Sequence, residues 1–509
     1  MNNNFMSAVK ETLNNEFNYS MTENGALGYR TTGKELLDLN FAVASLRKAT
    51  ERDIADRFVK AFFEDKIMAM KWLFFARDVR GGLGERRLFR AVIHEMANSH
   101  PEYIIPLMNL IPEYGRYDDL WNLLDSPLRE RVIEVVADQL RADKANYDAG
   151  KSISLLAKWL PSVNASSQRT KHYATLIRRS MGYTEREYRQ LVSSLRKYLK
   201  VVERQMSAKQ WNEISYEAVP SRANLIYNSA FLRNDEQRRR AFLASLEKGE
   251  TKINAGTLFP HDIVHKYMNY RYVNYYDATL EQLWKALPDT VQGCGNTIVV
   301  ADGSGSMTCS VDHASSTTAL DVANALAIYF AERSSGQFKD QYITFSSRPQ
   351  LVDLSNGKNL REKLLIALKH SEVANTNVEA VFDLILTTAV KNHMEQSELP
   401  QNILIISDME FDSCAYASYG SLNARLFSEI AARYADAGYK LPRLVFWNVN
   451  SRTGTIPIKE NDMGVALVSG FSVNVVKMVM SGKLDPYEAL VETLNTERYE
   501  PIAKALESI

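Results

Sequence analysis

The spacing of apolar residues changes near residue 290, and this change constrains the fold more than any other feature. Before it, apolar residues recur every three or four positions, as in residues 53–79 and 128–140, which is the period of amphipathic helices. After it, short β-branched runs alternate with helical stretches. The chain is therefore predicted to contain an α-helical array over residues 1–290 and an α/β domain over residues 291–509.

The second part has the pattern of a doubly wound sheet. Strands are predicted within residues 297–307, 341–347, 350–354, 401–409, 443–450 and 464–470, with helices between most of them. Such alternation is typical of a mostly parallel sheet with helices on both faces. In these sheets, ligands bind beyond the carboxyl ends of the strands.

Composition narrows the classes of protein that fit. The 509 residues carry 61 basic and 61 acidic side chains, but residues 1–290 hold an excess of seven basic residues and residues 291–509 an excess of seven acidic ones. No apolar run reaches the ~18 residues of a membrane span, and the first 25 residues lack the apolar core of a signal peptide. Three cysteines are too few for a disulfide framework. A cytoplasmic protein without membrane contact is expected.

A metal site is predicted where the first strand of the α/β domain ends. Asp302, Ser304 and Ser306 place one carboxylate and two hydroxyls on a tight turn, while Thr376 and Asp408 fall at later junctions. These hard oxygen ligands suit Mg²⁺, which would keep a position open for an outside carboxylate or phosphate. The alternative is an ordinary strand-to-helix turn. A phosphate-binding loop is disfavoured, because no lysine follows Gly305.

This five-residue set resembles the metal-ion-dependent adhesion site of von Willebrand factor A domains, over about residues 291–490. The resemblance implies that Ser304, Ser306 and Thr376 contact the metal directly or through water, and that Asp302 and Asp408 complete the shell. It also implies a protein partner that supplies a carboxylate to the ion. Glu410 and Asp412 lie just beyond. They either tune the site or are solvated loop acids, and the second interpretation is favoured.

The order of the two parts resembles the Ro autoantigen family, in which a TROVE module, a ring of HEAT-like helices, precedes a von Willebrand A domain. The segments that carry the resemblance are RDVRGGLGERRLFR (77–90), PEYGRYDDLWNLL (112–124), AKWLPS (157–162) and ISDMEFD (406–412). The resemblance implies a helical array, open or closed into a ring, that binds small noncoding or misfolded RNA.

A basic segment supports RNA binding independently of that resemblance. Residues 151–210 contain 13 Lys or Arg and three acids, and each phosphate that they neutralise adds salt-dependent affinity. The candidate contacts are Lys171, His172, Arg178, Arg179, Arg186, Arg189, Arg196, Lys197 and Lys200. Interleaved aromatic residues are candidates for base stacking: Trp159, Tyr173, Tyr183, Tyr188 and Tyr198. The alternative is a solvated helix face or ion pairing with acids elsewhere.

Several smaller motifs favour structural interpretations. They are a glycine loop expected to touch a neighbouring helix (81–84), an acidic pair expected to cap a helix (Asp118 and Asp119), two histidines expected in the core rather than on zinc (His261 and His265) and a solvated arginine run (238–240). No Ser/His/Asp constellation is evident.

Three functions are consistent with these patterns. The first is a non-enzymatic, Ro-like RNA-binding protein whose Mg²⁺-dependent A domain recruits a partner. The second is an RNA-independent scaffold or adhesion protein that binds an acidic partner through the metal. The third, a metal-dependent hydrolase, is the weakest, because no general base accompanies the metal ligands.

Overall fold

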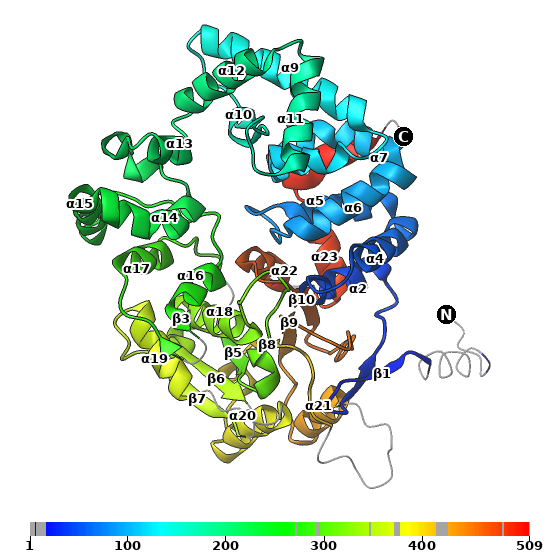
Figure 1. Ribbon diagram of the computed structural model, residues 1–509. Helices are drawn as coiled ribbons and strands as arrows, with labels where there is room; N and C mark the ends of the chain where they lie inside the picture. Colours follow the sequence, from blue (N-terminus) through cyan, green and yellow to red (C-terminus); the bar gives the residue numbers. More distant parts are fainter. Residues whose placement is uncertain are drawn as a thin grey trace. The chain divides into compact units, whose positions relative to one another are not determined.

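The computed structural model describes residues 6, 17–269, 272–291, 296–345, 348–370, 377–413, 426–480, 483–507 and 509. The chain forms two compact units (Figure 1). Residues 1–68 and 258–495 make up the first, here called the sheet unit, and residues 69–257 and 496–509 make up the second, the helical unit. The boundaries between these compact units therefore do not fall at residue 290, where the sequence pattern changes.

The sheet unit is built on six strands in the order β10-β9-β8-β5-β6-β7. Their bounds are Thr297–Asp302 (β5), Gln341–Phe345 (β6), Gln350–Asp353 (β7), Asn402–Ser407 (β8), Arg443–Asn448 (β9) and Val465–Ser469 (β10). All neighbouring pairs are parallel except β6 with β7, which is antiparallel. The result is a mixed sheet with a parallel core, and every residue of β5, β9 and β10 is buried, as both faces of a covered sheet require.

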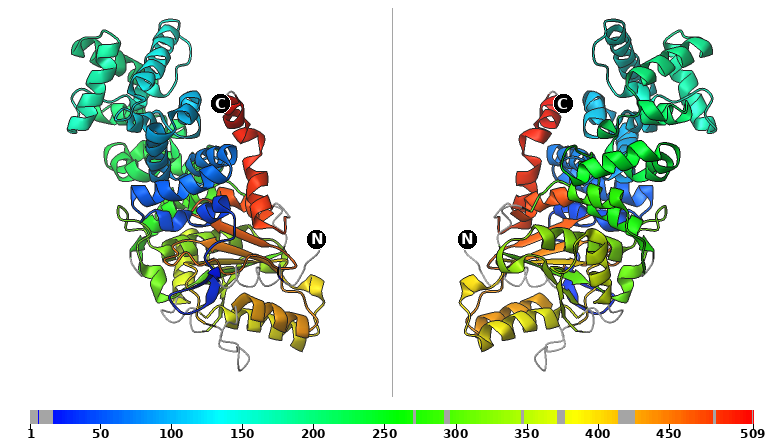
Figure 2. Two further views of the ribbon diagram at one scale, coloured as in Figure 1. Left: turned by 90° about the vertical axis from the view of Figure 1, so that its right-hand side faces the viewer. Right: turned by 90° about the vertical axis from the view of Figure 1, so that its left-hand side faces the viewer.

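Two neighbouring residues of β9 show that helices cover both faces of this sheet. Phe446 and Trp447 are consecutive, so their side chains point to opposite faces. The Phe446 ring lies 4.8 Å from Phe427 of α21 (Leu426–Asp436), and the Trp447 ring lies 5.8 Å from Phe330 of α18 (Ala319–Arg333). The α20 helix (Glu379–Lys391) packs beside α21 (Figure 2). The double winding expected from the sequence pattern is present.

The N-terminal segment belongs to the sheet unit, which corrects the expectation that residues 1–290 form one array. Its elements are β1 (Tyr19–Met21), β2 (Leu27–Tyr29), α2 (Glu35–Phe41), α3 (Val43–Leu46) and α4 (Glu51–Glu64). Tyr29 N–H donates to the Ile456 carbonyl at 2.8 Å. Asn448 Nδ2 donates to the Phe41 carbonyl at 2.8 Å, and Ala44 N–H donates to Ser469 Oγ at 2.9 Å. Local periodicity predicts the helices of this segment but not that they pack against the distant strands β9 and β10.

The remaining α-helices and strands of the sheet unit lie before, between and after these six strands in the sequence. They are α16 (Pro260–Tyr267), β3 (Met268–Asn269), β4 (Tyr272–Val273), α17 (Ala278–Lys285), α19 (Leu360–Lys369), α22 (Val476–Met480) and α23 (Pro486–Leu494). The α16 helix packs against α18, and residues 319–331 of α18 are all buried.

The helical unit contains most of the remaining helices. They are α5 (Lys66–Arg77, which begins in the sheet unit), α6 (Arg86–Ser99), α7 (Pro101–Ile104), α8 (Ile111–Tyr114), α9 (Arg129–Asp148), α10 (Leu156–Trp159), α11 (Gln168–Ser180), α12 (Glu185–Tyr198), α13 (Val202–Ser207), α14 (Ser221–Asn234), α15 (Glu236–Glu247) and α24 (Glu500–Leu506). The C-terminal residues are held by Asp78, which accepts hydrogen bonds from Arg498 Nη2 at 2.7 Å and Tyr499 Oη at 3.1 Å. Among the described residues, no helix is long and apolar enough to cross a membrane.

Two of the predicted structural motifs are confirmed in the helical unit. A Cβ on Gly82 would lie 1.9 Å from the Phe75 carbonyl oxygen, so the glycine loop does touch the neighbouring α5 helix. Asp119 accepts a hydrogen bond from Arg116 N–H at 3.0 Å and caps the 3-10 helix Tyr117–Leu123. The same buried carboxylate pairs with Arg77 at 2.8 Å.

The arginine run is an exception, because its middle residue is not solvated. Arg239 is fully buried, and its Nη1 donates to Asn224 Oδ1 at 3.0 Å. Its guanidinium packs over the rings of Tyr216 and Phe231 at 5.0 and 5.2 Å. The interpretation as a solvated surface run is therefore wrong at this position; on α15 one arginine faces inward while its two neighbours do not.

Candidate functional site

The predicted metal ligands lie at the point where the order of the strands reverses. From β5 the chain continues to β6 on one side, while β8 pairs with β5 on the other. Asp302 is the last residue of β5, and Asp408 follows Ser407, the last residue of β8. In open α/β sheets, this switch point is where ligands bind, so the topology brings together residues about one hundred positions apart.

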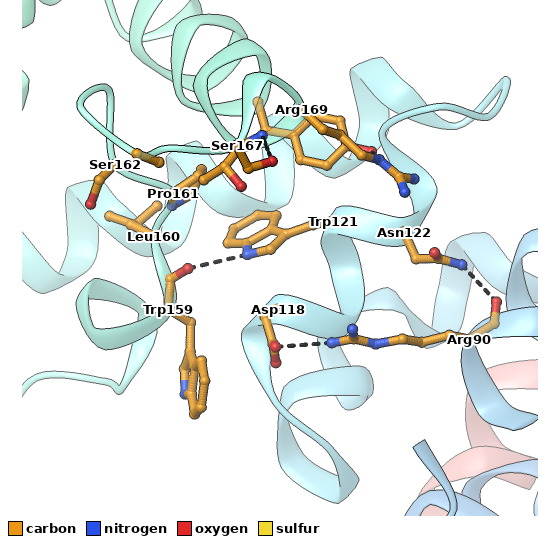
Figure 3. A pocket seen from close by; sticks show the side chains of 13 residues that line it. Arg90, Asp118, Trp121, Asn122, Trp159, Leu160, Pro161, Ser162, Ser167 and Arg169 are labelled. Atoms are coloured by element: carbon orange, nitrogen blue, oxygen red, sulfur yellow. Dashed lines mark hydrogen bonds and ion pairs between the residues drawn. The ribbon is translucent and has the colours of Figure 1, made fainter. Parts of the chain in front are cut away.

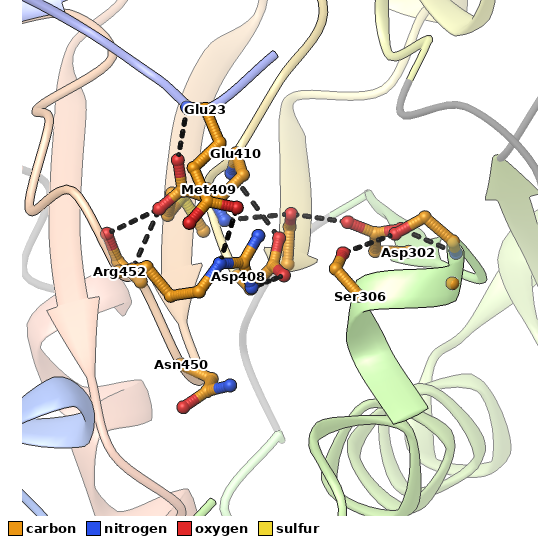
Figure 4. A network of polar contacts seen from close by, with 12 residues as sticks. Glu23, Asp302, Ser306, Asp408, Met409, Glu410, Asn450 and Arg452 are labelled. Carbon is orange, nitrogen blue, oxygen red and sulfur yellow. Dashed lines mark hydrogen bonds and ion pairs between the residues drawn. The ribbon is translucent and has the colours of Figure 1, made fainter. Parts of the chain in front are cut away.

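The described ligand atoms are held in place by short hydrogen bonds (Figure 4). Asp302 Oδ1 accepts from Ser304 N–H at 2.8 Å, and Asp302 Oδ2 accepts from Ser407 Oγ at 2.6 Å. Ser304 Oγ and Ser306 Oγ lie 3.0 Å apart. The figure shows Asp302 and Ser306 facing Asp408 across a small gap. Four of the five predicted ligands thus lie together, whereas Thr376 lies outside the described residues.

Burial makes this arrangement electrostatically costly without a cation. Asp302 and Asp408 are both buried, and desolvation together with the nearby Asp408 charge raises the pKa of Asp302 well above its ordinary value. Two carboxylates and two hydroxyls are the hard oxygen donors that Mg²⁺ prefers, so the residues present fit that ion. No group of three or more His, Cys, Asp or Glu side chains in the described chain could hold a metal, so this candidate depends on its serines.

Arg452 is a member of this site that the sequence analysis missed. It lies in the loop after β9, where its Nη1 pairs with Asp408 Oδ2 at 2.8 Å and its Nε pairs with Glu23 Oε2 at 2.7 Å. The guanidinium supplies Asp408 with a positive partner from the protein itself. No local motif marks Arg452, because it is 44 positions from Asp408 and meets it only through the pairing of β8 with β9.

Glu410 corrects the interpretation of a solvated loop acid. It is fully buried. Its Oε1 accepts from Arg452 N–H at 2.7 Å and Thr453 N–H at 2.9 Å, and its Oε2 accepts from Glu23 N–H at 2.9 Å. This carboxylate therefore fixes the loop after β9 and the β1–β2 turn beside Asp408 (Figure 4). Its position in an acidic loop gives no sign of such burial.

A Ser/His/Asp chain is present in the sheet unit, contrary to the sequence analysis. His265 Nδ1 lies 3.0 Å from Asp321 Oδ2, and His265 Nε2 lies 3.1 Å from Ser316 Oγ. Asp321 also accepts from Thr318 N–H at 3.0 Å and thereby caps α18. The chain joins α16 to the loop before α18. His261 is buried and packs against the Phe471 ring at 5.0 Å, as expected for a core residue. The His265 side chain is 27% exposed, so the expectation of a core position is wrong for His265.

The predicted RNA contacts divide into exposed and structural residues. Arg186, Arg189 and Lys197 are exposed on α12, and their spacings of about one and three turns place them on one face. His172 and Arg179 on α11 and Lys200 beyond α12 are also exposed. Lys171 and Arg178 are half-buried. These residues form what we call the basic faces of α11 and α12.

Arg196 and two of the tyrosines make structural contacts instead. Arg196 donates from Nε to the Ala157 carbonyl at 2.8 Å and from Nη2 to the Leu160 carbonyl at 2.7 Å. Tyr173 and Tyr188 are buried, and Tyr188 Oη donates to the Pro161 carbonyl at 2.9 Å. All three side chains thus have structural roles: Arg196 and Tyr188 hold the 157–162 segment against α12, and Tyr173 Oη donates to Asp125. Their contact with RNA stays a prediction.

A pocket of about 410 Å³ lies beside the start of α11 (Figure 3). Figure 3 shows the Trp121 ring inside it, with its Nε1 donating to the Trp159 carbonyl at 3.1 Å. Arg90 and Asn122 line one side and Arg169 the other. Sequence patterns do not connect Trp121, Arg90 and Asn122 with the basic segment, because these residues precede it and reach it only through the fold.

Comparison with known proteins places the chain in a family. The model of a domain of unknown function, DUF2828, matches residues 22–126 and 126–297, more than half of the chain, and the chain belongs to that family. A second domain of unknown function, DUF7788, matches residues 296–506. The uncharacterized protein L728 of Acanthamoeba polyphaga mimivirus is 31% identical over 532 residues, which cover 95% of this chain and 89% of the relative.

One solved structure is also similar. The crystal structure of the Deinococcus radiodurans RO (RSR) protein matches 86% of this chain and 92% of its own, with 11% sequence identity and a TM-score of 0.37. At that TM-score the two structures superpose only loosely.

Proposed function

We propose that this chain is an RNA-binding protein whose helical unit holds single-stranded RNA. The observation that carries the proposal is the pocket at the start of α11, in which the Trp121 ring lies between Arg90 and Arg169. An aromatic ring with neighbouring guanidinium groups is the usual surface on which unpaired bases stack. Asn122 adds an amide that can hydrogen-bond a base edge.

The basic faces of α11 and α12 would then hold the RNA backbone. Arg179, Arg186, Arg189 and Lys197 are exposed, so they can approach phosphates without breaking an internal contact. Each neutralised phosphate of a single strand contributes about −0.7 to the slope of log affinity against log salt. The half-buried Arg196 and the buried Tyr188 instead hold α12 against residues 157–161.

The test is binding of a labelled single-stranded RNA by fluorescence anisotropy over a series of salt concentrations. Reversing Arg179, Arg186, Arg189 and Lys197 to Glu is expected to weaken binding at least tenfold in low salt and to flatten the salt slope. A matched control reverses Lys248 and Lys252, which are exposed in the same unit but away from these helices. Undetectable binding by the unaltered protein in ~50 mM salt, or equal losses in both variants, would contradict the proposal.

We propose further that the sheet unit has a von Willebrand A-like metal site and recruits a protein partner through it. Asp302, Ser304, Ser306 and Asp408 would hold Mg²⁺, with Thr376 as a fifth ligand, and the ion would present an open position to a carboxylate of the partner. The chemistry required is binding, so no enzymatic role is proposed. The buried carboxylates and the seryl oxygens that lie 3.0 Å apart support this assignment.

A scaffold without RNA is the second candidate function, and the same metal site favours it. It predicts partner capture that depends on Mg²⁺ while RNA binding is absent. Pull-down of carboxylate-bearing peptides with and without EDTA, run beside the RNA titration, distinguishes the two functions. Only the RNA-binding function predicts that charge reversal on α11 and α12 causes a loss of RNA binding.

A further inference from the structure

A second pocket, of about 520 Å³, lies in the sheet unit beside the candidate metal site. One wall comes from residues within 45–60, which contain the end of α3 and most of α4, and the other from residues 450–452 in the loop after β9. Arg452 belongs to both places: it lines this pocket and pairs with Asp408 of the metal site. The volume is that of a small-molecule site rather than of a single water.

The charges that line this pocket favour an anion. Lys48, Arg57, Lys60 and Arg452 line it together with two acids, Asp53 and Asp56. Asp53 is already engaged by Thr50 in the capping box of α4, with its Oδ2 accepting from Thr50 Oγ1 at 2.7 Å. Asp56 has Arg52 beside it at 3.9 Å. The cationic groups therefore outnumber the acids, and both acids have other partners.

A buried amide gives an independent indication of a ligand. Asn450 is 2% exposed and lines the pocket, and its Nδ2 has no hydrogen-bond partner among the described residues. A buried donor left without an acceptor costs about 1–3 kcal/mol, which an oxygen of a bound ligand would recover. Amide N–H groups only donate, so the missing group is an acceptor, in agreement with the excess of positive charge.

We propose that this pocket binds a phosphate group, carried as the monoester of a small molecule. Lys48, Arg57 and Lys60 supply charge to a dianion, and the Asn450 amide donates to one of its oxygens. The pocket is much larger than inorganic phosphate, so an ester with an organic part is expected to bind more tightly than the free ion. Neither the metal site nor the RNA-binding pocket is needed for this step.

Because Arg452 is shared, the phosphate site is expected to act on the metal site, a consequence that rests on the proposed metal function. A phosphate in the pocket competes with Asp408 for the Arg452 guanidinium, and a released Asp408 is a better ligand for Mg²⁺. Phosphate therefore raises Mg²⁺ affinity, and by linkage Mg²⁺ raises phosphate affinity by the same factor.

The test is calorimetric titration of the full chain with inorganic phosphate and with glycerol 3-phosphate, both in EDTA. The unaltered protein is expected to bind both, the ester more tightly. Arg57→Gln with Lys60→Gln is expected to weaken binding at least fivefold, and Asn450→Asp, which replaces a donor by a negative oxygen, to weaken it as much. Lys391→Gln is the control, because this lysine is exposed at the end of α20 and lies outside the pocket lining.

The outcomes separate the two parts of the inference. No binding of either anion, or equal weakening in the Lys391→Gln control, overturns the phosphate site. A Mg²⁺ titration with and without glycerol 3-phosphate tests the linkage: an unchanged Mg²⁺ affinity overturns it. If Mg²⁺ does not bind at all, the proposed metal function fails together with the linkage, whereas phosphate binding in EDTA still supports the pocket.

Discussion

At the scale of single residues, the candidate metal site combines strong local signals with partners that no local signal marks. Asp302, Ser304 and Ser306 are readable from the sequence because they sit on one turn, and Asp408 because it ends an apolar run. Arg452 and Glu410 are not readable in this way, because nothing local shows that the fold buries Glu410 or brings the exposed Arg452 to the buried Asp408. Sequence periodicity predicts faces of elements, whereas these contacts depend on tertiary packing.

Asp302→Asn tests the electrostatic cost of this site. Removing one of two buried carboxylates is expected to stabilise the metal-free protein by about 1 kcal/mol, which would raise the melting temperature by roughly 2–4 °C. The same substitution should abolish any upward shift of the melting temperature caused by Mg²⁺. Thermal unfolding with EDTA and with Mg²⁺ measures both effects, and Asp436→Asn, an exposed acid on α21, is the control. A lower melting temperature in EDTA would contradict the assigned repulsion.

Glu410→Gln tests the buried carboxylate as an organiser of the loop. Glutamine would turn an N–H₂ group toward backbone N–H donors that now bond to an oxygen, so a loss of about 2–3 kcal/mol in the free energy of unfolding is expected. Urea unfolding measures it. Glu460→Gln, at an exposed position of the same connection, should change little; comparable losses in the two variants would argue against the organising role.

At the scale of elements, α12 shows that two arginines on one helix face can have different roles, since Arg189 and Arg196 lie two turns apart. The sequence predicts the helix and its capping signal, Thr184 with Glu187, and both are present. It did not distinguish Arg196 from Arg189, because both lie in one basic run. The distinction comes from the 157–162 segment, whose carbonyl oxygens face Arg196 and whose position depends on packing rather than on the helical period.

Arg196→Gln should therefore lower the stability of the protein, whereas Arg189→Gln should lower its affinity for RNA. Loss of the Arg196 hydrogen bonds leaves carbonyl oxygens without their charged donor and is expected to cost about 2 kcal/mol of stability, with little change in RNA affinity per folded molecule. Arg189→Gln should leave stability within about 0.5 kcal/mol and weaken RNA binding. Urea unfolding and anisotropy on the same preparations compare them. Equal effects of the two variants on RNA affinity would show that the proposed interface is misplaced.

At the scale of the whole molecule, the chain passes between its two compact units at three places, near residues 68, 257 and 495. The change of periodicity near residue 290 agrees with the point where the two matching family models meet, at 296–297. The boundaries of the compact units fall at other positions, because α2, α3 and the β1–β2 turn complete the sheet unit. Sequence patterns thus locate the change of fold class but not the packing partner of the first 68 residues.

A fragment of residues 291–509 tests this organisation. It lacks α2, α3 and α16, and so exposes surfaces of β10 and α18 that they cover in the whole chain. The fragment is expected to be aggregation-prone or without fixed tertiary packing, as near-UV circular dichroism and limited proteolysis would show. Residues 258–495 joined by a linker to residues 17–68 should instead have fixed tertiary packing and resist proteolysis. A cooperative, protease-resistant 291–509 fragment would contradict the discontinuous unit.

The position of α2 has a consequence for synthesis on the ribosome. Ala44 and its partner Ser469 are 425 positions apart, and at ~5–20 residues per second the second emerges roughly 20–85 s after the first. During that interval Leu36, Leu37 and Phe41, all buried in the finished protein, have no sheet to cover them. The nascent chain must therefore be shielded by a chaperone or by transient contacts, so its yield in a cell depends on folding factors as well as on stability.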